Sequence, residues 1–192
     1  TGFSNVYDTI IELAAVKIKN GQVLERFERF ANPHRPLTAK IIELTHITDD
    51  MLVNAPEIED VIREFHEFIG DAIVVAHNAS FDLGFLYVAY KKAGLAGVEH
   101  PAIDTVELSR LVNPDMKAHN LKALTKRYNI ELTQHHRAIY DTEATGELML
   151  HLLKQADAMG IKYHDEFNKH VGGAEGYKQS RPSHCTVLAV DN

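Results

Sequence analysis

The segment His77–Asp82 (HNASFD) contains the first side chains whose types and spacing suit chemistry. It follows a short apolar run and precedes a stretch with helical periodicity, in which Ser80 is the expected N-cap. Asp82 then falls in the first helical turn, three residues before Phe85, and so shares the apolar face of the helix. A carboxylate is rarely buried on such a face without a partner. Asp82 therefore either binds a cation or another donor, or only stabilises the helix N-terminus by its charge.

The segment His136–Asp141 (HRAIYD) repeats this arrangement at a second helix start. Asp141 lies seven residues before Leu148 and shares the core-facing stripe of the expected helix. Five residues on a helix turn by about 500°, so His136 lies near Asp141 only if it precedes the helix, in a loop. A first-turn aspartate beside a surface histidine is the alternative, but the recurrence favours a shared site. The spacing alone does not choose between His136 and its neighbour His135.

Two inward carboxylates at two helix starts are the ligands that hard divalent cations such as Mg²⁺ and Mn²⁺ prefer. Pairs of such cations, held by shared carboxylates, support in-line phosphoryl transfer. A histidine beside them, with a pKa near neutrality, can take the proton of an attacking water. Such sites usually contain more than two acidic residues, and the further acids are ambiguous. Glu12 lies in an apolar strand and points either inward or to solvent, and Asp104 is placed to cap a helix.

Composition and motifs exclude several other classes of function. The 192 residues carry 20 Lys and Arg against 27 Asp and Glu, so a net charge of −7 cannot hold nucleic acid by itself. No apolar stretch reaches the roughly 20 residues of a membrane span. The one cysteine, Cys185, excludes an internal disulfide and fits a reducing cytoplasm. The absence of GxxxxGK[ST], GxGxxG, GxSxG and HExxH motifs leaves P-loop, Rossmann, serine-hydrolase and zincin functions without support.

The elements that must position these residues alternate between strands and helices. Asn20-Gly21 separates two β-rich runs, 9–19 and 22–30, which is the strongest short signal for a hairpin. A buried strand is expected at 72–76 and a short one at 101–104. Helices are expected in short turns at 37–52, capped by Thr38 and Thr48, and at 58–69, 80–92, 105–112, 120–128 and 141–159. We therefore predict an α/β fold, a mixed sheet with helices on both faces and with the chemistry at strand-to-helix junctions.

The composition of the chain changes near Gly160. Residues 160–183 contain several glycines and a proline but few large apolar side chains, which is typical of a linker. Residues 186–190 (TVLAV) then have the pattern of a strand that belongs to another domain. The sequence thus predicts one domain at 1–159, and a linker with the start of a following domain at 160–192.

Several segments resemble motifs of the DEDDh family of 3′–5′ exonucleases. HNASFDLGFL (His77–Leu86) and HHRAIYDTEAT (His135–Thr145) resemble its second and third motifs, and IDTVELSRL (Ile103–Leu111) resembles the segment between them. Thr1-Gly2-Phe3 is similar to the end of the first motif, Asp-x-Glu-Thr-Thr-Gly. The similarity covers residues 1–159 and is greatest to the proofreading exonuclease domains of PolC-type bacterial DNA polymerases. Arg181–Ala189 (RPSHCTVLA) resembles the point where their polymerase-and-histidinol-phosphatase (PHP) domain resumes.

This resemblance implies a ribonuclease H-like fold, here without its first, central strand, and a role for individual residues. By position, Asp82 and Asp141 would bind two divalent cations, Mg²⁺ or Mn²⁺, and His136 would be the general base. The Asp and Glu of the first motif would lie before Thr1, so residues 1–192 alone are expected to have little activity. His46 stands where the family often has glycine. The expected substrate contacts are Gly2, Phe3, Thr45, His46, Asn78, Phe81 and Phe85.

The activity implied by the resemblance is metal-dependent removal of nucleotides from a single-stranded or frayed DNA 3′ end, which releases nucleoside monophosphates. One cation would activate the attacking water while His136 takes its proton, and the other would stabilise the leaving 3′ oxygen. The implied partners are the remainder of the polymerase chain and replisome subunits in the cytoplasm, with no membrane. Two alternatives stay open: a nucleic-acid-binding or scaffold segment with an incomplete site, and an RNA exonuclease similar to RNase T.

Overall fold

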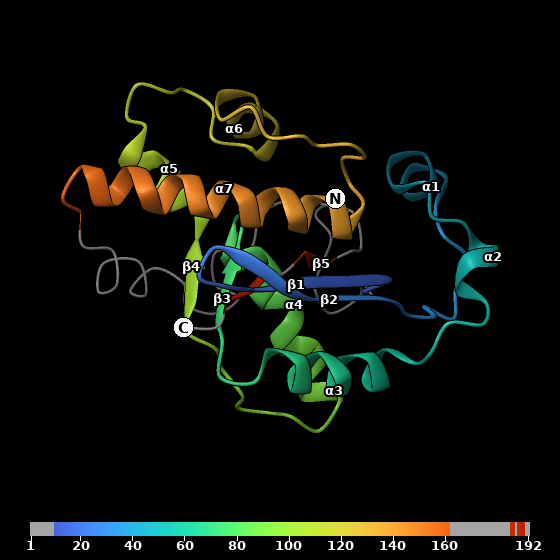
Figure 1. Cartoon of the computed structure of the whole chain (residues 1–192). Helices are drawn as coiled ribbons and strands as arrows, with labels where there is room; N and C mark the ends of the chain where they lie inside the picture. The colour runs from blue at the N-terminus through green and yellow to red at the C-terminus, as the bar shows by residue number, and fades with distance from the viewer. Residues whose placement is uncertain (1–9, 162–184, 187, 191–192) are drawn as a thin grey trace.

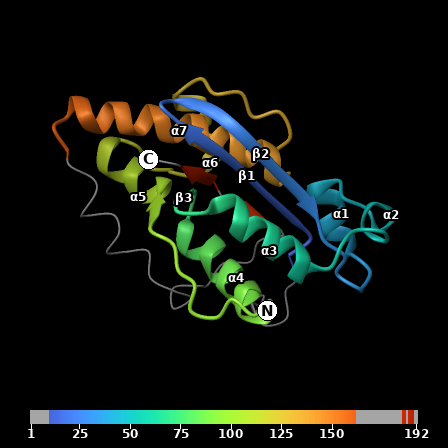
Figure 2. The ribbon, with the colours of Figure 1, turned by 60° about the horizontal axis from the view of Figure 1, so that its bottom comes forward.

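Strands from both halves of the chain form one mixed β-sheet in the computed structural model, which describes residues 10–161, 185–186 and 188–190. The strands are β1 (Glu12–Lys19), β2 (Gln22–Phe30), β3 (Ile73–Ala76), β4 (Ala102–Asp104), β5 (Cys185–Thr186) and β6 (Leu188–Val190). The helices are α1 (Ala39–Thr45), α2 (Asp49–Leu52), α3 (Ile58–Ile69), α4 (Ala79–Lys92), α5 (Thr105–Val112), α6 (Leu121–Arg127) and α7 (Ala138–Ala158). The sheet order is β2-β1-β6-β3-β4, and β5 also pairs with β1. As predicted, helices lie on both sides, α7 on one and α3 with α4 on the other (Figure 1, Figure 2).

The hairpin of β1 and β2 forms as the sequence predicts. Asn20 (φ 51°) and Gly21 (φ 76°) both have a positive φ, as a two-residue type I′ turn requires. The two strands pair antiparallel along their whole length, with one register shift after Lys17. β2 is an edge strand whose side chains are mostly exposed, whereas β1 is buried on both faces.

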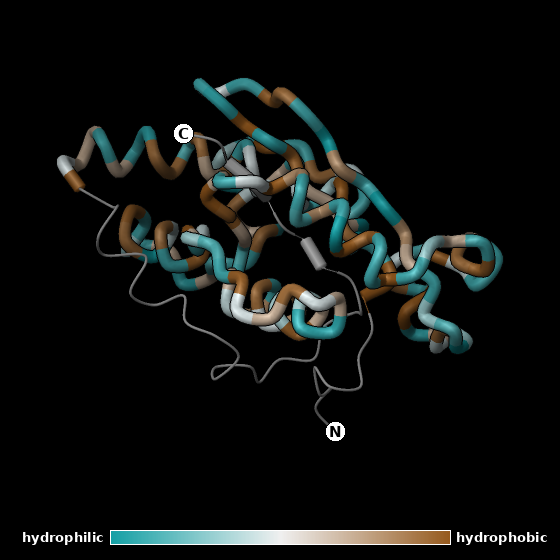
Figure 3. Tube along the Cα trace, turned by 90° about the horizontal axis from the view of Figure 1, so that it is seen from below, coloured by the Kyte–Doolittle hydropathy of each residue, from teal (hydrophilic) through white to brown (hydrophobic). Residues whose placement is uncertain are grey.

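Alternate side chains of β1 contribute to the core on the two sides of the sheet. Leu13 and Ala15 belong to the cluster that packs against α3 and α4. Val16 and Ile18 face the other way and pack with Met149 of α7. A further cluster holds α5 and α6 against α7. Figure 3 shows hydrophobic and hydrophilic stretches alternating along the helices, as expected where one helix face is buried.

Most helices begin and end close to the positions predicted from periodicity. α3 spans the predicted 58–69 and ends at Gly70, whose φ of 54° suits glycine. Asn120 caps α6, because its side chain accepts the N–H of Ala123 at 2.8 Å. Thr38 caps α1 in the same way at 3.3 Å, whereas Thr48 precedes α2 without such a bond. Local capping therefore explains the start of some of these helices but not of all.

The start of α4 differs from the prediction that Ser80 is its N-cap. The N-cap position is held by Asn78 (φ 71°), whose side chain makes no capping hydrogen bond. The carboxylate of Asp104 accepts the backbone N–H of Asn78 at 3.1 Å and of Ala79 at 3.0 Å. It also caps α5, as predicted, by accepting the N–H of Val106 at 2.8 Å. Ser80 is the wrong residue because an acceptor at the end of β4 already binds the free N–H groups of α4.

β6 occupies the position in the sheet where the resemblance implied a missing central strand. It pairs parallel with β1, Ala189 lying opposite Lys17, and antiparallel with β3, Ala189 lying opposite Val74. Within the described residues the sheet is therefore continuous from β2 to β4, and the expected gap between the hairpin and β3 is not observed. The strand predicted at 186–190 is present in part, and it pairs with this sheet. The division into a domain at 1–159 and a following segment stays a prediction.

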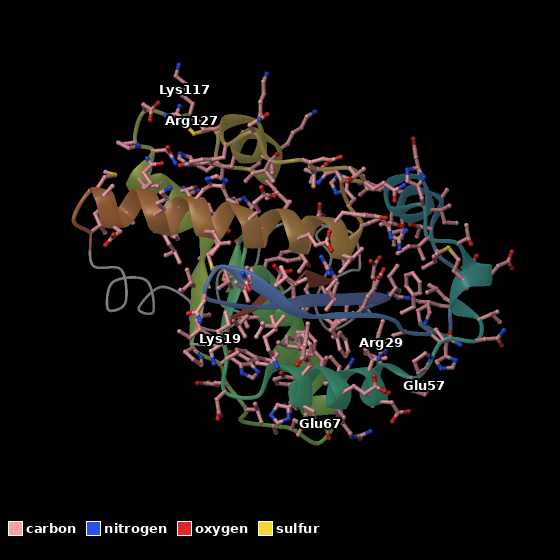
Figure 4. The ribbon with its side chains drawn as sticks, in the orientation of Figure 1. Lys19, Arg29, Glu57, Glu67, Lys117 and Arg127 are labelled. Carbon is pink, nitrogen blue, oxygen red and sulfur yellow. The ribbon has the colours of Figure 1, made fainter. Side chains whose placement is uncertain are left out.

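The described surface is charged and locally paired. Arg29 extends from β2 toward α3, where its Nε lies 3.2 Å from Glu64, and Arg127 pairs with Asp115 at 3.0 Å on the side of the molecule that carries Lys117 (Figure 4). Because these side chains are largely exposed, solvent screens each pair, which contributes at most about 1 kcal/mol. None of the helices within residues 10–161 combines the length and the apolar character needed to cross a membrane.

Replacing Asp104 by alanine should destabilise the protein more than removing an ordinary helix cap. Asp104 is 7% exposed, and Asp104→Ala leaves three backbone N–H groups without their acceptor. The N–H of Ala79 is buried and those of Asn78 and Val106 are partly buried. A buried donor left unpaired costs about 1–3 kcal/mol, whereas an exposed N-cap contributes about 1 kcal/mol. Urea denaturation should therefore show a loss of at least about 3 kcal/mol for Asp104→Ala and about 1 kcal/mol for the control Asn120→Ala. Equal losses would show that the contact with α4 contributes nothing.

Candidate active site

Three side chains meet where α7 begins. His135 and His136 lie in the loop before this helix, and Asp141 lies in its first turn, 7% exposed. Asp141 Oδ1 is 3.0 Å from His135 Nδ1, and Asp141 Oδ2 accepts the backbone N–H of His136 at 3.2 Å. One potential ligand atom from each of the three residues lies within 4.8 Å of the others. The structure confirms that His136 precedes the helix and brings His135 into the same group.

The backbone keeps the two histidine rings together. His136 has a φ of 72°, in the left-handed region, which costs an L-residue about 1–2 kcal/mol. The hydrogen bond from its N–H to Asp141 stabilises this turn, and the ring centroids of His135 and His136 lie 3.8 Å apart. The His135 side chain is 38% exposed and that of Asp141 only 9%. The group is therefore open to solvent on its histidine side.

An ion pair between Arg137 and the buried Glu12 connects the loop of His135 and His136 to strand β1 of the sheet. Arg137, the N-cap residue of α7, donates through Nε to Glu12 Oε2 at 3.2 Å, across 125 residues of sequence. Its Nη2 lies 3.7 Å from Glu28 Oε1, and its guanidinium lies over the ring of Phe30, 5.6 Å from the centroid. Glu12 is fully buried on β1, so the alternative of a surface position is wrong. Burial raises the pKa of Glu12, and the nearby charge of Arg137 opposes this shift.

The sequence analysis did not identify Arg137. A signal was nevertheless available, because an arginine stands between the two site residues His136 and Asp141, and one glutamate stands in an apolar strand. Two opposite charges that are each surrounded by core positions are expected to pair.

Asp82 lies on α4, in its first turn, and is 3% exposed. The inward orientation predicted from its spacing to Phe85 is therefore confirmed. Among the described residues Asp82 is not part of the group at the start of α7. α4 and α7 both contact β5, which pairs with β1 at Leu13 and Ala14. The two inward aspartates thus belong to helices that flank the same short strand.

His77 connects the start of α4 to α5 and to the loop before α6. Its Nδ1 lies 2.8 Å from Thr105 Oγ1, and its Nε2 lies 2.9 Å from the carbonyl oxygen of His119. Because a carbonyl only accepts, Nε2 carries a proton. The ring of His119 is in turn 2.9 Å from Ser109 Oγ. These hydrogen bonds orient the segment that begins at His77.

Two of the expected substrate contacts lie at the C-terminal end of α1, Thr45 as its last residue and His46 as its C-cap. Thr45 is buried, and its hydroxyl donates to the carbonyl of Ile41 at 2.7 Å and accepts the N–H of Ile47 at 3.2 Å. His46 is exposed and has a φ of 59°. Glycine adopts this conformation without strain, which gives a physical reason for its frequent occurrence at this position in the family that the sequence resembles. At this helix end, His46 rather than Thr45 faces solvent.

The other expected substrate contacts lie on or near α4. Phe81 and Phe85 are buried in the core cluster, with ring centroids 5.2 Å apart, so their packing role is evident from the structure. Asn78 is partly buried at the N-cap. Gly2 and Phe3 lie outside the described residues. The assignment of all these residues to substrate binding stays a prediction.

The donor groups of this region fit divalent cations. Asp82 and Asp141 offer buried carboxylate oxygens, and the half-buried ring of His136 lies next to Asp141. Glu12 is engaged by Arg137. A mixed sheet with helices on both faces, and with carboxylates and a histidine at two helix starts, is the arrangement of the ribonuclease H-like class, and these side chains could hold divalent cations of the kind that support phosphoryl transfer.

Comparison with known proteins identifies the family. The pattern of the exonuclease family RNase_T matches residues 1–149, and the chain belongs to this family. It is 61% identical to DNA polymerase III PolC-type of Bacillus subtilis (strain 168) and 57% identical to that of Bacillus cereus, in each case over 100% of this chain. The corresponding protein of Staphylococcus aureus is 54% identical over 98% of the chain. The chain spans 13% of the length of these relatives.

Solved structures of exonucleases share the fold. Exonuclease X in complex with 5′ overhanging duplex DNA has a TM-score of 0.65 and 25% identity, covering 90% of this chain and 97% of that one. E. coli exonuclease I in complex with a dA16 oligonucleotide has a TM-score of 0.60 and 16% identity, covering 72% and 35%. A 3′-exonuclease that recognises a histone mRNA stem-loop has a TM-score of 0.56 and 10% identity, covering 76% and 83%. The last two show the fold alone.

The stability difference between wild type and Glu12→Gln should depend on pH. Burial raises the pKa of Glu12, so above the ordinary value of 4.5 the folded state of the wild type binds more protons than the unfolded state. The free energy of unfolding of the wild type should therefore fall, relative to that of Glu12→Gln, as pH rises from 4.5 through the folded pKa. Urea denaturation of both proteins between pH 4.5 and 8 measures this difference. The opposite slope would show that the attraction of Arg137 outweighs burial.

Proposed function

We propose that this chain is a divalent-cation-dependent 3′–5′ exonuclease that acts on DNA, as the proofreading region of a PolC-type DNA polymerase III. The observation that carries the proposal is His136 beside the carboxylate of Asp141, with a second buried carboxylate, Asp82, on α4. Identities of 61% and 54% to PolC-type proteins over nearly the whole chain support it. So does the likeness to exonuclease X, whose structure contains DNA.

In the proposed mechanism Asp82 and Asp141 bind two cations, Mg²⁺ or Mn²⁺, through carboxylate oxygens. When bound, the cations supply the Lewis acidity and positive charge that a scissile phosphate requires and that a protein of net charge −7 lacks. His136 takes the proton of the attacking water, since its ring lies on the solvent-open side of the group. Arg137, held by Glu12, keeps the loop of His136 against the sheet.

We propose a single-stranded or frayed DNA 3′ end as the substrate of this site. The polymerase remainder of the same parent chain and replisome subunits are the proposed partners, and the cytoplasm is the proposed location. The support for these proposals is the similarity to replicative polymerases described above.

One assay distinguishes the proposal from its two alternatives, a nucleic-acid-binding scaffold segment and an RNA exonuclease similar to RNase T. The full-length protein and residues 1–192 are each given a 3′-labelled single-stranded DNA and an RNA of the same sequence, with Mg²⁺ or with a chelator. The proposal predicts cation-dependent release of nucleoside monophosphates from DNA, by the full-length protein above all. Binding without release in either condition would favour the scaffold alternative, and faster release from RNA would favour the RNase T-like one.

Loss of either inward aspartate should remove nearly all turnover. Asp82→Ala and Asp141→Ala each delete a proposed cation ligand, and changes outside the ligand set typically cost only about 10–100-fold. We expect a larger loss in the full-length protein, with an unchanged circular dichroism spectrum. The exposed Asp115→Ala, which only breaks the pair with Arg127, is the control. Near-normal turnover of either variant at saturating Mg²⁺ would contradict the ligand assignment.

The two adjacent histidines should differ in their contribution to the rate. His136→Ala should lower turnover by about 10²–10⁴-fold, the usual effect of removing a general base. His135→Ala should have a much smaller effect. A pH–rate series of both variants checks the assignment, because only loss of the base removes the limb near neutral pH. If His135→Ala removes that limb instead, the base has been assigned to the wrong ring.

A further inference from the structure

We propose that His135, His136 and Asp141 together bind one transition-metal ion of the Zn²⁺ class. This site differs in ligand chemistry from the oxygen ligands proposed above for Mg²⁺. Its binding step is independent of the proposed function, whereas its inhibitory consequence rests on that function.

The distances between the three side chains suit one small ion. Ligand atoms bound to the same ion at about 2.0–2.2 Å in tetrahedral geometry lie roughly 3.3–3.6 Å apart. His135 Nδ1 and Asp141 Oδ1 are 3.0 Å apart. One ligand atom from each of the three residues lies within 4.8 Å of the others. The side chain of His135 is 38% exposed, so it is the member of the set least held by packing.

The donor set selects the kind of ion. Two imidazole nitrogens and one carboxylate oxygen suit Zn²⁺, Co²⁺ and similar ions, whereas Mg²⁺ prefers oxygen ligands and retains water. Three protein ligands with a solvent-open side also match metal sites that keep an open coordination position. The left-handed turn at His136, fixed by the bond of its N–H to Asp141, holds the donors on one short stretch of chain before any ion arrives.

Occupancy of this site would remove two groups that the proposed reaction needs. The ring nitrogen of His136 would be bound to the ion and could not take a proton, and Asp141 would be held by the wrong cation. A Zn²⁺-class ion would therefore inhibit, and His135, which has no role in the proposed mechanism, would determine the sensitivity to it.

The binding step is tested on residues 1–192 without any nuclease assay. Co²⁺ is titrated into the protein while the visible absorption of nitrogen-ligated Co²⁺ is recorded, and Zn²⁺ is then added to displace it. We expect one equivalent to bind, and His135→Ala to weaken binding by about 10-fold or more. The control His151→Ala removes a histidine that stacks on Tyr128, away from this group, and should bind as tightly as the wild type. Equal affinity of His135→Ala and the wild type, or no absorption change, would overturn the proposal.

The inhibitory consequence is tested separately in the full-length protein at saturating Mg²⁺. Each protein is compared with its own rate without Zn²⁺, and we expect the inhibition constant for Zn²⁺ to rise by about 10-fold or more in His135→Ala but not in His151→Ala. Tight binding to the wild type without inhibition would overturn this consequence. A protein that binds Co²⁺ through His135 but releases no nucleotides would contradict the proposed function and leave the metal site intact.

Discussion

A carboxylate removed from water must find donors, and this constraint determines how the helices meet the sheet. Asp104 satisfies it with three backbone N–H groups from the starts of α4 and α5. Glu12 meets it through one oxygen, Oε2, which accepts from the guanidinium of Arg137 at the start of α7. Burial raises the pKa of both carboxyl groups, and their hydrogen-bond donors oppose this shift. Each of the two residues joins a strand to the first turn of a helix.

The positions of the proposed catalytic groups follow from these two contacts. Asp82 lies in the helical turn that Asp104 holds against β4, and Asp141 lies in the turn that Arg137 and Glu12 hold against β1. Both aspartates lie in the first turn of a helix, where an acidic side chain is generally favoured. The scaffold therefore holds both carboxylates at helix starts and facing inward.

Features with local causes could be predicted from the sequence. The hairpin at Asn20-Gly21, the span of α3 and the burial of Asp82 and Asp141 depend on turn chemistry and on apolar spacing within a few residues. Features that depend on residues far apart in the sequence could not be predicted in this way. The cap of α4 comes from Asp104 and not from Ser80, because the acceptor lies on another strand. The burial of Glu12 stayed undecided, since its partner Arg137 is 125 residues away. The strand in the middle of the sheet comes from residues 188–190, a pairing that no periodicity indicates.

The long sequence separation of the Glu12–Arg137 pair has a consequence for the order of folding. The β1–β2 hairpin and helix α3 consist of neighbours in sequence and can form within microseconds. Docking of α7 on β1 must instead close a loop of more than a hundred residues, the kind of contact that slows folding. The loop of His135 and His136 reaches its position only in that late step. Secondary structure should thus return first during refolding, and the histidine–aspartate group should assemble among the last features of the molecule.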